Sequence, residues 1–247
     1  MKLNVGLIGK GNWGKIIEKK LNALSNLKFV CGKKRSYLKL IKSSNIHWVF
    51  IVTPNKTHYK LVKMCLDNKV NVFCEKPLCL TTIQAKELIK IAKKNKVKLF
   101  ISDLYNFYTN KFKKNESITE VYRSKFVNGL DNEFFFRLMY HDISILYKHL
   151  NNLISFTCQI FQNNFEKKFQ LVINSSNKKK FTFFYDLKSK KKRHLINDLQ
   201  IKSKKDILKE MINNVLKKRV NYYQNNQKAI FIIKFINEIK KKVKYAN

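Results

Sequence analysis

The stretch VNVFCEKPL, residues 70–78, is the part of the chain from which the fold is most directly predicted. Val70, Val72 and Phe73 are apolar and partly β-branched, which is typical of a short buried strand in a covered parallel sheet. Glu75, Lys76 and Pro77 follow at the carboxyl end of this strand, where open α/β sheets bind their ligands. Because proline disfavours the helical region for the residue before it, Lys76 is predicted to be extended there.

A glycine-rich turn stands near the amino end of the chain. Residues 3–8 form a predicted strand, and GKGNWG, residues 9–14, follows it directly and opens a helix that is predicted to end near Leu24. The first glycine allows a tight turn, the second lets a pyrophosphate approach the backbone, and the third allows close packing. The free N–H groups of a helix amino terminus favour an anion. The predicted dinucleotide contacts here are Gly9, Gly11, Asn12, Trp13 and Gly14.

A third motif follows the strand predicted at residues 48–52. Thr53, Pro54 and Asn55 form a predicted turn, and His58 lies at the start of a helix predicted at residues 57–68. A histidine at this place is also compatible with a capping or solvated role.

The three motifs GKGNWG (9–14), VTPNKTH (52–58) and EKP (75–77) together resemble the Gfo/Idh/MocA family of nicotinamide-dependent sugar oxidoreductases. Their order and spacing match the family in the amino-terminal part of the chain, and the similarity becomes patchy towards the carboxyl end. The resemblance implies that the two later motifs border the cofactor. The implied contacts are Thr53, Pro54, Asn55, His58, Glu75 and Lys76.

The end of the second predicted strand, residues 29–32, bears on the choice of cofactor. It leads into the run GKKRS, residues 32–36, which has no acidic residue. A domain selective for NAD places Asp or Glu here to bind the ribose 2′-hydroxyl. Cations and a hydroxyl suit a 2′-phosphate, so the sequence favours NADP over NAD. Because lysine is common throughout this chain, Arg35 and Ser36 support this prediction most.

Oxidation of a sugar alcohol needs a hydride acceptor, a group that takes the hydroxyl proton, and groups that position the carbon. His141 begins a predicted helix that ends near Leu150, and the run HDISIL resembles the catalytic histidine motif of the sugar-nucleotide members. The resemblance therefore implies that Lys76 and His141 are the catalytic pair. The alternative for His141 is a histidine with satisfied hydrogen bonds at a seam between domains.

The chain departs from the family at Arg137, because the family usually carries an aspartate four residues before the histidine. A carboxylate there would orient the substrate, whereas a guanidinium suits an anionic substrate such as a nucleotide sugar or uronic acid. Because residues four apart are neighbours on a helix, Arg137 is predicted to share a face with His141 and to bind substrate. Asp142 is predicted to point from a different face and is not a replacement. Tyr105 lies in a segment that resembles the family's crossover and is the second predicted substrate contact.

Alternating strands and helices in the first part of the chain predict a Rossmann-type, doubly wound parallel sheet over residues 1–104. Residues 105–247 are predicted to form a shortened α+β domain whose sheet is mainly antiparallel and is a candidate surface for homo-oligomers. Its predicted strands are residues 118–126, 156–161, 169–174, 180–185 and 193–197. Two helices close the chain; Ser203 is predicted to cap the first, and the second is predicted at residues 227–243.

The composition shows a formal net charge of +36, with 52 Lys and Arg against 16 Asp and Glu. A charge of this size normally suggests a nucleic-acid partner. Almost all of it is lysine spread along the chain, although arginine is the preferred reader of phosphates and bases, so nucleic-acid binding is not favoured. The five cysteines form no CxxC pair, and Cys31 and Cys74 fall in apolar strands, which predicts reduced core residues in a cytoplasmic protein. We predict no metal site and no membrane span.

The sequence therefore predicts an NAD(P)-dependent oxidoreductase acting on a small-molecule sugar or nucleotide sugar. One alternative is a cofactor-binding regulatory protein of the same fold that has lost turnover through Arg137. Another is an anion-binding module that depends on net charge, with an affinity that falls steeply with salt.

Overall fold

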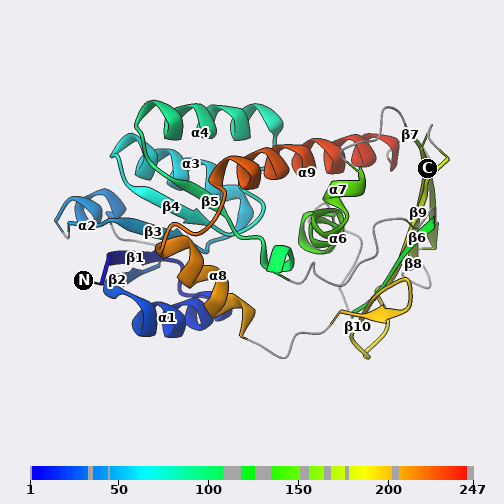
Figure 1. The fold of residues 1–247 in the computed structure, drawn as a ribbon, viewed down its shortest axis with the longest axis horizontal. Coiled ribbons are helices and arrows are strands. Elements are labelled where there is room, and N and C mark those ends of the chain that lie inside the picture. Colours follow the sequence, from blue (N-terminus) through cyan, green and yellow to red (C-terminus); the bar gives the residue numbers. More distant parts are fainter. Residues whose placement is uncertain are drawn as a thin grey trace. The chain divides into compact units, whose positions relative to one another are not determined.

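The computed structural model describes residues 2–32, 36–43, 45–107, 118–125, 135–150, 156–163, 168–175, 178–201 and 206–243. The chain forms two compact units (Figure 1). The first combines Met1–Leu104 with Asp206–Lys234, and the second combines Tyr105–Lys205 with Phe235–Asn247. The second segment of the first unit therefore comes from the range that the sequence assigns to the second domain.

The first unit is built on a parallel sheet with the strand order β2-β1-β3-β4-β5 within the described residues. The strands are β1 (Asn4–Ile8), β2 (Asn26–Cys31), β3 (Trp48–Ile51), β4 (Asn71–Cys74) and β5 (Leu99–Ile101). The helices are α1 (Asn12–Leu24), α2 (Tyr37–Ser43), α3 (Asn55–Asp67), α4 (Thr82–Lys94), α8 (Ile207–Leu216) and most of α9 (Tyr222–Val243). The predicted doubly wound parallel fold is confirmed.

Helices cover both faces of this sheet, which explains why its central strands are apolar throughout. α3 and α4 pack together on one side, whereas α1 packs against α8 on the other (Figure 1). Every residue of β3 is buried, and Phe50 stacks on Phe73 of β4 with ring centroids 4.5 Å apart. Thr81 caps α4 by accepting a hydrogen bond from the Gln84 N–H, as its spacing predicts.

The start of α9 is fastened to the edge of the parallel sheet. The side-chain amide of Asn225 donates to the Ile101 carbonyl at 2.9 Å, and its oxygen accepts from the Ile101 N–H at 2.8 Å. Lys228, one turn later, forms a buried ion pair of 2.6 Å with Asp103, just after β5. The ring of Tyr222 also stacks on Trp48, with centroids 6.2 Å apart. These contacts make α9 part of the first unit up to Lys234.

The second unit is built on a mixed sheet with the strand order β11-β10-β6-β9-β8-β7 within the described residues. The strands are β6 (Ile118–Ser124), β7 (Phe156–Asn163), β8 (Lys168–Ser175), β9 (Lys180–Asp186), β10 (Arg193–Ile196) and β11 (Leu199–Gln200). Within the described residues, neighbouring strands of this sheet are antiparallel except β6 and β9, which are parallel. The mainly antiparallel sheet is thus confirmed. Along β9, Phe181, Phe183 and Tyr185 are buried, whereas the alternate residues 182, 184 and 186 are half-buried.

Short helical elements precede β7 in the second unit. They are the turn η1 (Leu104–Phe107), the π-helical turn η3 (Phe135–Met139), α6 (Tyr140–Ile145) and α7 (Tyr147–Leu150). The π-helical turn was not predicted, because its residues are as apolar as those of an ordinary buried helix. The single helix predicted from His141 to near Leu150 is divided at Leu146 into α6 and α7, and the second of these ends at Leu150 as predicted.

Two helix starts differ from their predictions for a capping reason. Asp206 caps α8, because its carboxylate accepts from the Lys209 N–H, whereas Ser203 lies outside the described residues. α9 begins at Tyr222 rather than at residue 227, because the Asn221 side chain accepts from the Gln224 N–H. The apolar stripe used for the prediction starts later than the cap.

The thiols of Cys31, Cys65, Cys74 and Cys79 are buried, and burial was predicted for Cys31 and Cys74. Burial raises the pKa of Cys65 and of Cys79 to about 12, so these thiols are poor nucleophiles at neutral pH.

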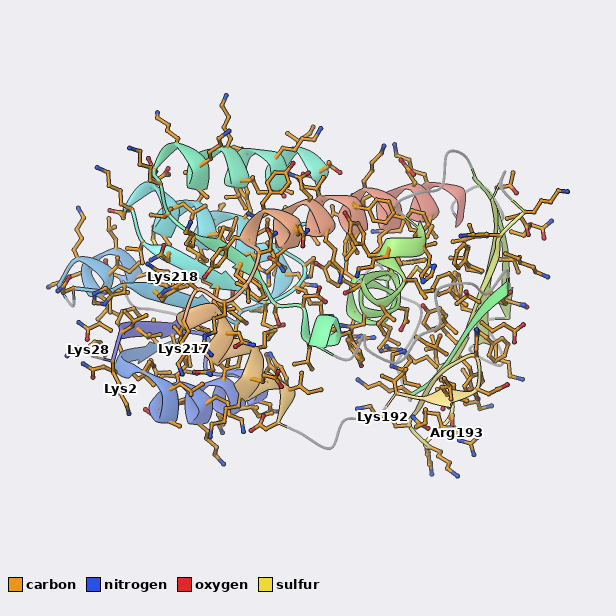
Figure 2. The ribbon with its side chains drawn as sticks, viewed as in Figure 1. Lys2, Lys28, Lys192, Arg193, Lys217 and Lys218 are labelled. Atoms are coloured by element: carbon orange, nitrogen blue, oxygen red, sulfur yellow. The ribbon has the colours of Figure 1, made fainter. Side chains whose placement is uncertain are left out.

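Basic side chains project from both units, as Figure 2 shows. The labelled examples Lys2, Lys28, Lys217 and Lys218 belong to the first unit, and Lys192 and Arg193 stand at the start of β10 in the second. Across the part of the chain described here, no helix combines the length and the apolar character needed to cross a membrane.

Candidate functional site

The turn between β1 and α1 has the shape that the glycine spacing predicts. Gly9 has φ +127°, and a Cβ added to it would lie 2.5 Å from the Val52 oxygen. A Cβ on Gly14 would lie 2.2 Å from the Gly9 oxygen, so helix and turn approach each other too closely for any side chain. A Cβ on Gly11, by contrast, would meet nothing within 4 Å. The backbone at Gly11 therefore faces open space, as a ligand phosphate requires.

The amino terminus of α1 also fits an anion. Gly11 is its N-cap and supplies no side-chain cap, and the first turn contains no acidic residue. The first N–H groups of a helix lack intrahelical acceptors and carry the positive end of its dipole. Asn12 and Trp13 begin the helix, and the Trp13 side chain is exposed.

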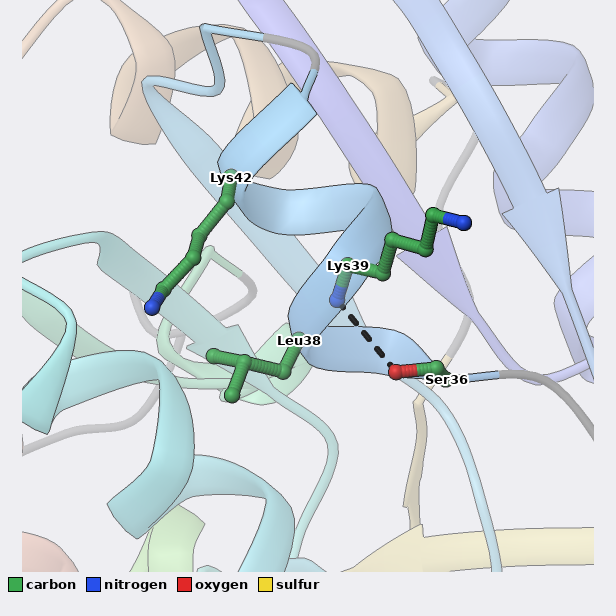
Figure 3. Close-up of a pocket in the computed structure, with 4 residues that line it drawn as sticks. All are labelled: Ser36, Leu38, Lys39 and Lys42. Carbon is green, nitrogen blue, oxygen red and sulfur yellow. Dashed lines mark hydrogen bonds between the residues drawn. The ribbon is translucent and has the colours of Figure 1, made fainter.

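The region after β2 holds positive charge and a shallow hollow. The Lys10 side chain passes Gly32, with its Cδ 3.7 Å from where a Cβ of Gly32 would stand. A hollow of about 490 Å³ is lined by Ser36, just before α2, and by Leu38, Lys39 and Lys42 on α2 (Figure 3). The Ser36 Oγ accepts a hydrogen bond from the Lys39 N–H at 3.4 Å. Arg35 lies outside the described residues, whereas Lys10 is a cation that the sequence prediction omitted.

The turn after β3 is fastened to the EKP motif by His58. This side chain is fully buried, and its Nδ1 lies 2.6 Å from the Pro77 oxygen while its Nε2 lies 2.8 Å from the Thr53 oxygen. Thr57 donates to the Pro54 oxygen at 2.7 Å and completes the turn around Asn55. His58 therefore joins the two motifs, and both ring nitrogens are engaged by backbone.

Glu75 and Lys76 leave the sheet at the carboxyl end of β4. The Glu75 N–H donates to the Ile51 oxygen of β3 at 2.9 Å, and the Lys76–Pro77 peptide bond is cis. Glu75 Oε1 is buried and has no hydrogen-bond partner among the described residues. A buried carboxylate oxygen of this kind normally has a donor, which a bound ligand can supply.

The three motifs of the first unit meet at one edge of its sheet. β1, β3 and β4 are adjacent and parallel, so their carboxyl ends point the same way. Val52 donates to Ile8 at 2.9 Å, directly before the glycine turn and the Thr53 turn. The open backbone at Gly11 and the orphaned oxygen of Glu75 lie along this edge, so the residues present fit a dinucleotide.

The second unit brings together residues that the sequence did not connect. The ring of His141, which is half-buried, packs on Tyr105 with centroids 4.9 Å apart. Tyr105 in turn meets the ring of His194 edge-on at 5.4 Å, and the Arg123 guanidinium lies 5.9 Å from the Tyr105 ring centre. Burial raises the pKa of the Tyr105 hydroxyl.

Asp142 lies behind this group and is fully buried. Its Oδ1 accepts from Arg123 Nη2 at 2.6 Å and lies 2.9 Å from His194 Nε2, and its Oδ2 accepts from the Tyr185 hydroxyl at 2.9 Å. Burial on its own would raise the pKa of Asp142, but Arg123 and His194 outweigh it and hold that pKa below its ordinary value. The predicted direction of Asp142, away from the face of His141, agrees with these contacts.

Arg137 lies in η3, one element before His141, and belongs to a group of cations. Partial burial, followed by the charges of Lys192, Arg137 and Arg123, lowers the pKa of Lys125. Arg193 pairs with Ser124 in the antiparallel register, which places Lys192 next to Lys125. Like charges so close repel one another unless an anion lies between them.

Arg123, Tyr185 and His194 are the residues that the sequence analysis missed. Each lies on a different strand, β6, β9 or β10, and only the sheet register brings them together. Arginine and histidine at inward positions of apolar strands were the available signal, since such residues are rarely buried without partners.

Comparison with known proteins gives the following relationships. Residues 16–102 match the profile of an oxidoreductase family with an NAD-binding Rossmann fold, GFO_IDH_MocA. A trans-1,2-dihydrobenzene-1,2-diol dehydrogenase from Xenopus laevis is 41% identical over 59 residues, which cover 24% of this chain and 18% of the relative. A myo-inositol 2-dehydrogenase from Thermotoga maritima is 30% identical over 137 residues, 48% of this chain and 41% of the relative. The matched regions thus span well under half of these curated relatives.

The fold is also found among solved structures. UDP-N-acetylglucosamine 3-dehydrogenase GnnA from Acidithiobacillus ferrooxidans superposes with a TM-score of 0.80 and covers 97% of each chain at 16% sequence identity. At this identity the likeness establishes the fold of both units, not the reaction.

Proposed function

We propose that the chain is an NAD(P)-dependent oxidoreductase acting on a sugar or nucleotide sugar, because residues 16–102 match the profile of the GFO_IDH_MocA oxidoreductases with an NAD-binding Rossmann fold. The reaction is hydride transfer between a secondary alcohol or ketone of the substrate and the nicotinamide. The observation that carries the proposal is Lys76, which leaves β4 at the sheet edge that also presents the open backbone of Gly11. Relatives with sugar-dehydrogenase names support the substrate class.

The proposed roles follow from these positions. Gly9, Gly11, Asn12, Trp13 and Gly14 would hold the pyrophosphate, and Thr53, Pro54, Asn55 and Glu75 would border the ribose and nicotinamide, with His58 holding their turns. When bound, the nicotinamide supplies the hydride acceptor or donor. Lys76 and His141 would hold and move the hydroxyl proton, and Tyr105 and Arg137 would orient the substrate.

NADP is the favoured cofactor. No acidic residue follows β2, whereas Lys10 lies over Gly32 and Ser36 stands at the start of α2. Arg35→Ala should weaken NADPH binding on the order of tenfold or more and leave NADH binding nearly unchanged, because it removes a charge-assisted contact to phosphate. Equal losses for both cofactors would exclude Arg35 as the reader of the 2′-phosphate.

An anionic substrate is favoured by the cations around Arg137. Lys125 and Lys192 place further positive charge on the same side of the second unit. Arg137→Ala should therefore raise the Michaelis constant of a nucleotide sugar more than it lowers turnover. If Arg137→Ala raised the Michaelis constant of a neutral sugar by the same factor, Arg137 would not bind a negative group of the substrate.

The experiment that tests the whole proposal begins with cofactor binding. The chain has two tryptophans, and Trp13 is 40% exposed while Trp48 is 1% exposed. Cofactor binding next to α1 should quench the fluorescence of Trp13, and Trp13→Phe should abolish the signal while calorimetry still detects binding. Absence of saturable NADPH and NADH binding by both methods would overturn the proposal.

Turnover is then measured with a panel of sugars and nucleotide sugars through the absorbance of the reduced nicotinamide. The alternative, a cofactor-binding regulatory protein of the same fold, is favoured by the missing carboxylate at Arg137. It predicts binding without turnover by the wild type, and a gain of hydride transfer in Arg137→Asp.

A further inference from the structure

His141 and Asp142 are consecutive in α6, yet they lie in different surroundings. His141 is half-buried, whereas Asp142 is fully buried and bound by residues from three strands. The donors are Arg123 from β6, Tyr185 from β9 and His194 from β10. Three partners leave the Asp142 carboxylate little freedom, so they also fix the backbone that carries His141.

The same residues reach His141 by a second route. Arg123 and His194, which bind Asp142, also contact the ring of Tyr105, and Tyr105 contacts the ring of His141. These contacts form a closed circuit. It runs from Asp142 through His194 and Tyr105 to His141, and the peptide bond between residues 141 and 142 completes it. A side chain held by its backbone and by its ring has little rotational freedom left.

The charges of this circuit are balanced inside the unit. Burial opposes both shifts, but Arg123 and His194 together lower the pKa of Asp142, and Asp142, Tyr105 and Tyr185 together raise that of Arg123. The Tyr185 hydroxyl, whose pKa is raised by burial and by Asp142, stays a hydrogen-bond donor. Asp142 is therefore fully engaged and cannot serve as a substrate contact.

We propose that Asp142, Arg123 and His194 are positioning residues that hold Tyr105 and fix the orientation of His141. The resemblance to the family implies an orienting carboxylate at the position of Arg137, and the three residues would take over its role from behind α6 rather than from the substrate side. The inference rests on the proposed function for its catalytic consequence. The dependence of the His141 ring position on His194, through Tyr105, holds whether or not the proposed function is correct.

The decisive variant is His194→Gln, with His149→Gln as the matched control, because His149 lies on α7 of the same unit and outside the circuit. In the full chain with NADPH bound, His194→Gln should lower kcat on the order of tenfold to a hundredfold, since small misplacements of a reacting group have effects of this size. The Michaelis constant and the NADPH affinity should change by about twofold or less. His149→Gln should change none of these.

NMR separates this inference from the proposed function. The ring resonances of His141, assigned with His141→Gln, should move in His194→Gln and stay in place in His149→Gln, whether or not a substrate is known. Unmoved His141 resonances in a folded His194→Gln protein would overturn the inference. Failure of the wild type to turn over any substrate would instead overturn the proposed function.

A second pair decides the matter if His194→Gln does not fold. Tyr105→Phe keeps the ring that contacts both histidines, and Tyr105→Leu removes it. The His141 resonances and kcat should depart from the wild type more in Tyr105→Leu than in Tyr105→Phe. Equal departures would show that the ring of Tyr105 does not connect the two histidines.

Discussion

Gly11 and Gly14 lie in one turn, but a methyl group would meet different surroundings at each. Gly14→Ala places its Cβ 2.2 Å from the Gly9 oxygen, so we expect a loss of about 1–3 kcal/mol in the free energy of unfolding. Gly11→Ala has room for its Cβ and an ordinary extended φ of −70°, so its stability should change by about 1 kcal/mol or less. Denaturant unfolding measures both.

The effect of Gly11→Ala on cofactor affinity should be larger than its small effect on the free energy of unfolding. The added methyl of Gly11→Ala occupies the space that a pyrophosphate would need, so NADPH affinity should fall although the protein stays folded. Calorimetry on the folded variant gives the measurement. Undiminished affinity in Gly11→Ala would mean that the phosphate binds elsewhere.

His58 should stabilise the fold and hold Lys76 in its position for turnover. His58→Ala removes a fully buried ring and leaves the Thr53 and Pro77 carbonyls without it, at a cost of about 2–4 kcal/mol. His47→Ala is the matched control, because that histidine is exposed and its ring accepts a hydrogen bond from the Asn4 N–H. Because Pro77 follows Lys76, kcat of His58→Ala should fall more than cofactor affinity does. Equal stability losses in the two variants would contradict this assignment.

Sequence patterns identified single residues where the constraint is local. Gly9 and Gly14 were predicted from spacing, because tight turns and close approach depend on neighbours in sequence. His194 and Arg123 were not predicted, because their hydrogen-bond partner Asp142 is 52 and 19 residues away in sequence. The role of His58 as a link between two turns was missed for the same reason, because its partner Pro77 follows the next strand, β4.

Elements with a strong period or a clear cap were predicted closely. The strands β1 to β4 and the helices α1 and α3 lie within three residues of their predicted bounds. Errors occurred where an apolar stripe begins later than the helix itself, as in α9, whose cap Asn221 is polar and far from the stripe. The parallel pairing of β6 with β9 could not be predicted, because pairing depends on contacts across the whole second unit.

The start of α8 offers a test at this scale. Asp206 accepts from the Lys209 N–H at 3.1 Å and pairs with Lys20 of α1. Asp206→Ala should cost about 1 kcal/mol, because it leaves a helix N–H without an acceptor. Asp206→Asn keeps the cap but not the ion pair, and should recover most of this loss, since exposed ion pairs contribute little. Thermal unfolding compares the three proteins, and an unrecovered loss in Asp206→Asn would assign the effect to Lys20.

For the whole molecule, the buried Asp142 predicts how stability depends on pH. Its pKa in the folded chain lies below its ordinary value of 3.8, so the stabilisation that it provides is present above that value. It is lost as pH falls through the folded pKa, because the unfolded chain then binds the proton more readily. The free energy of unfolding should therefore fall between about pH 5 and pH 3.

The variant Asp142→Asn isolates this contribution from other carboxylates. At neutral pH it should cost about 3–5 kcal/mol, because Arg123 would remain buried without its counter-charge. Between about pH 5 and pH 3 its stability should fall less than that of the wild type. Parallel curves for the two proteins, measured by denaturant unfolding, would show that Asp142 does not titrate in this range.

The bonds between Asn225 and Ile101 have a consequence for the solution behaviour of the protein. β5 is a terminal strand of its sheet, and such strands offer backbone groups with which a foreign strand can align. The Asn225 amide imitates one residue of an incoming strand, because it satisfies both the N–H and the carbonyl of Ile101. The Asn225 side chain therefore occupies a position at which a strand of another molecule would begin to pair with β5. We expect this contact to oppose fibril formation through the β5 edge.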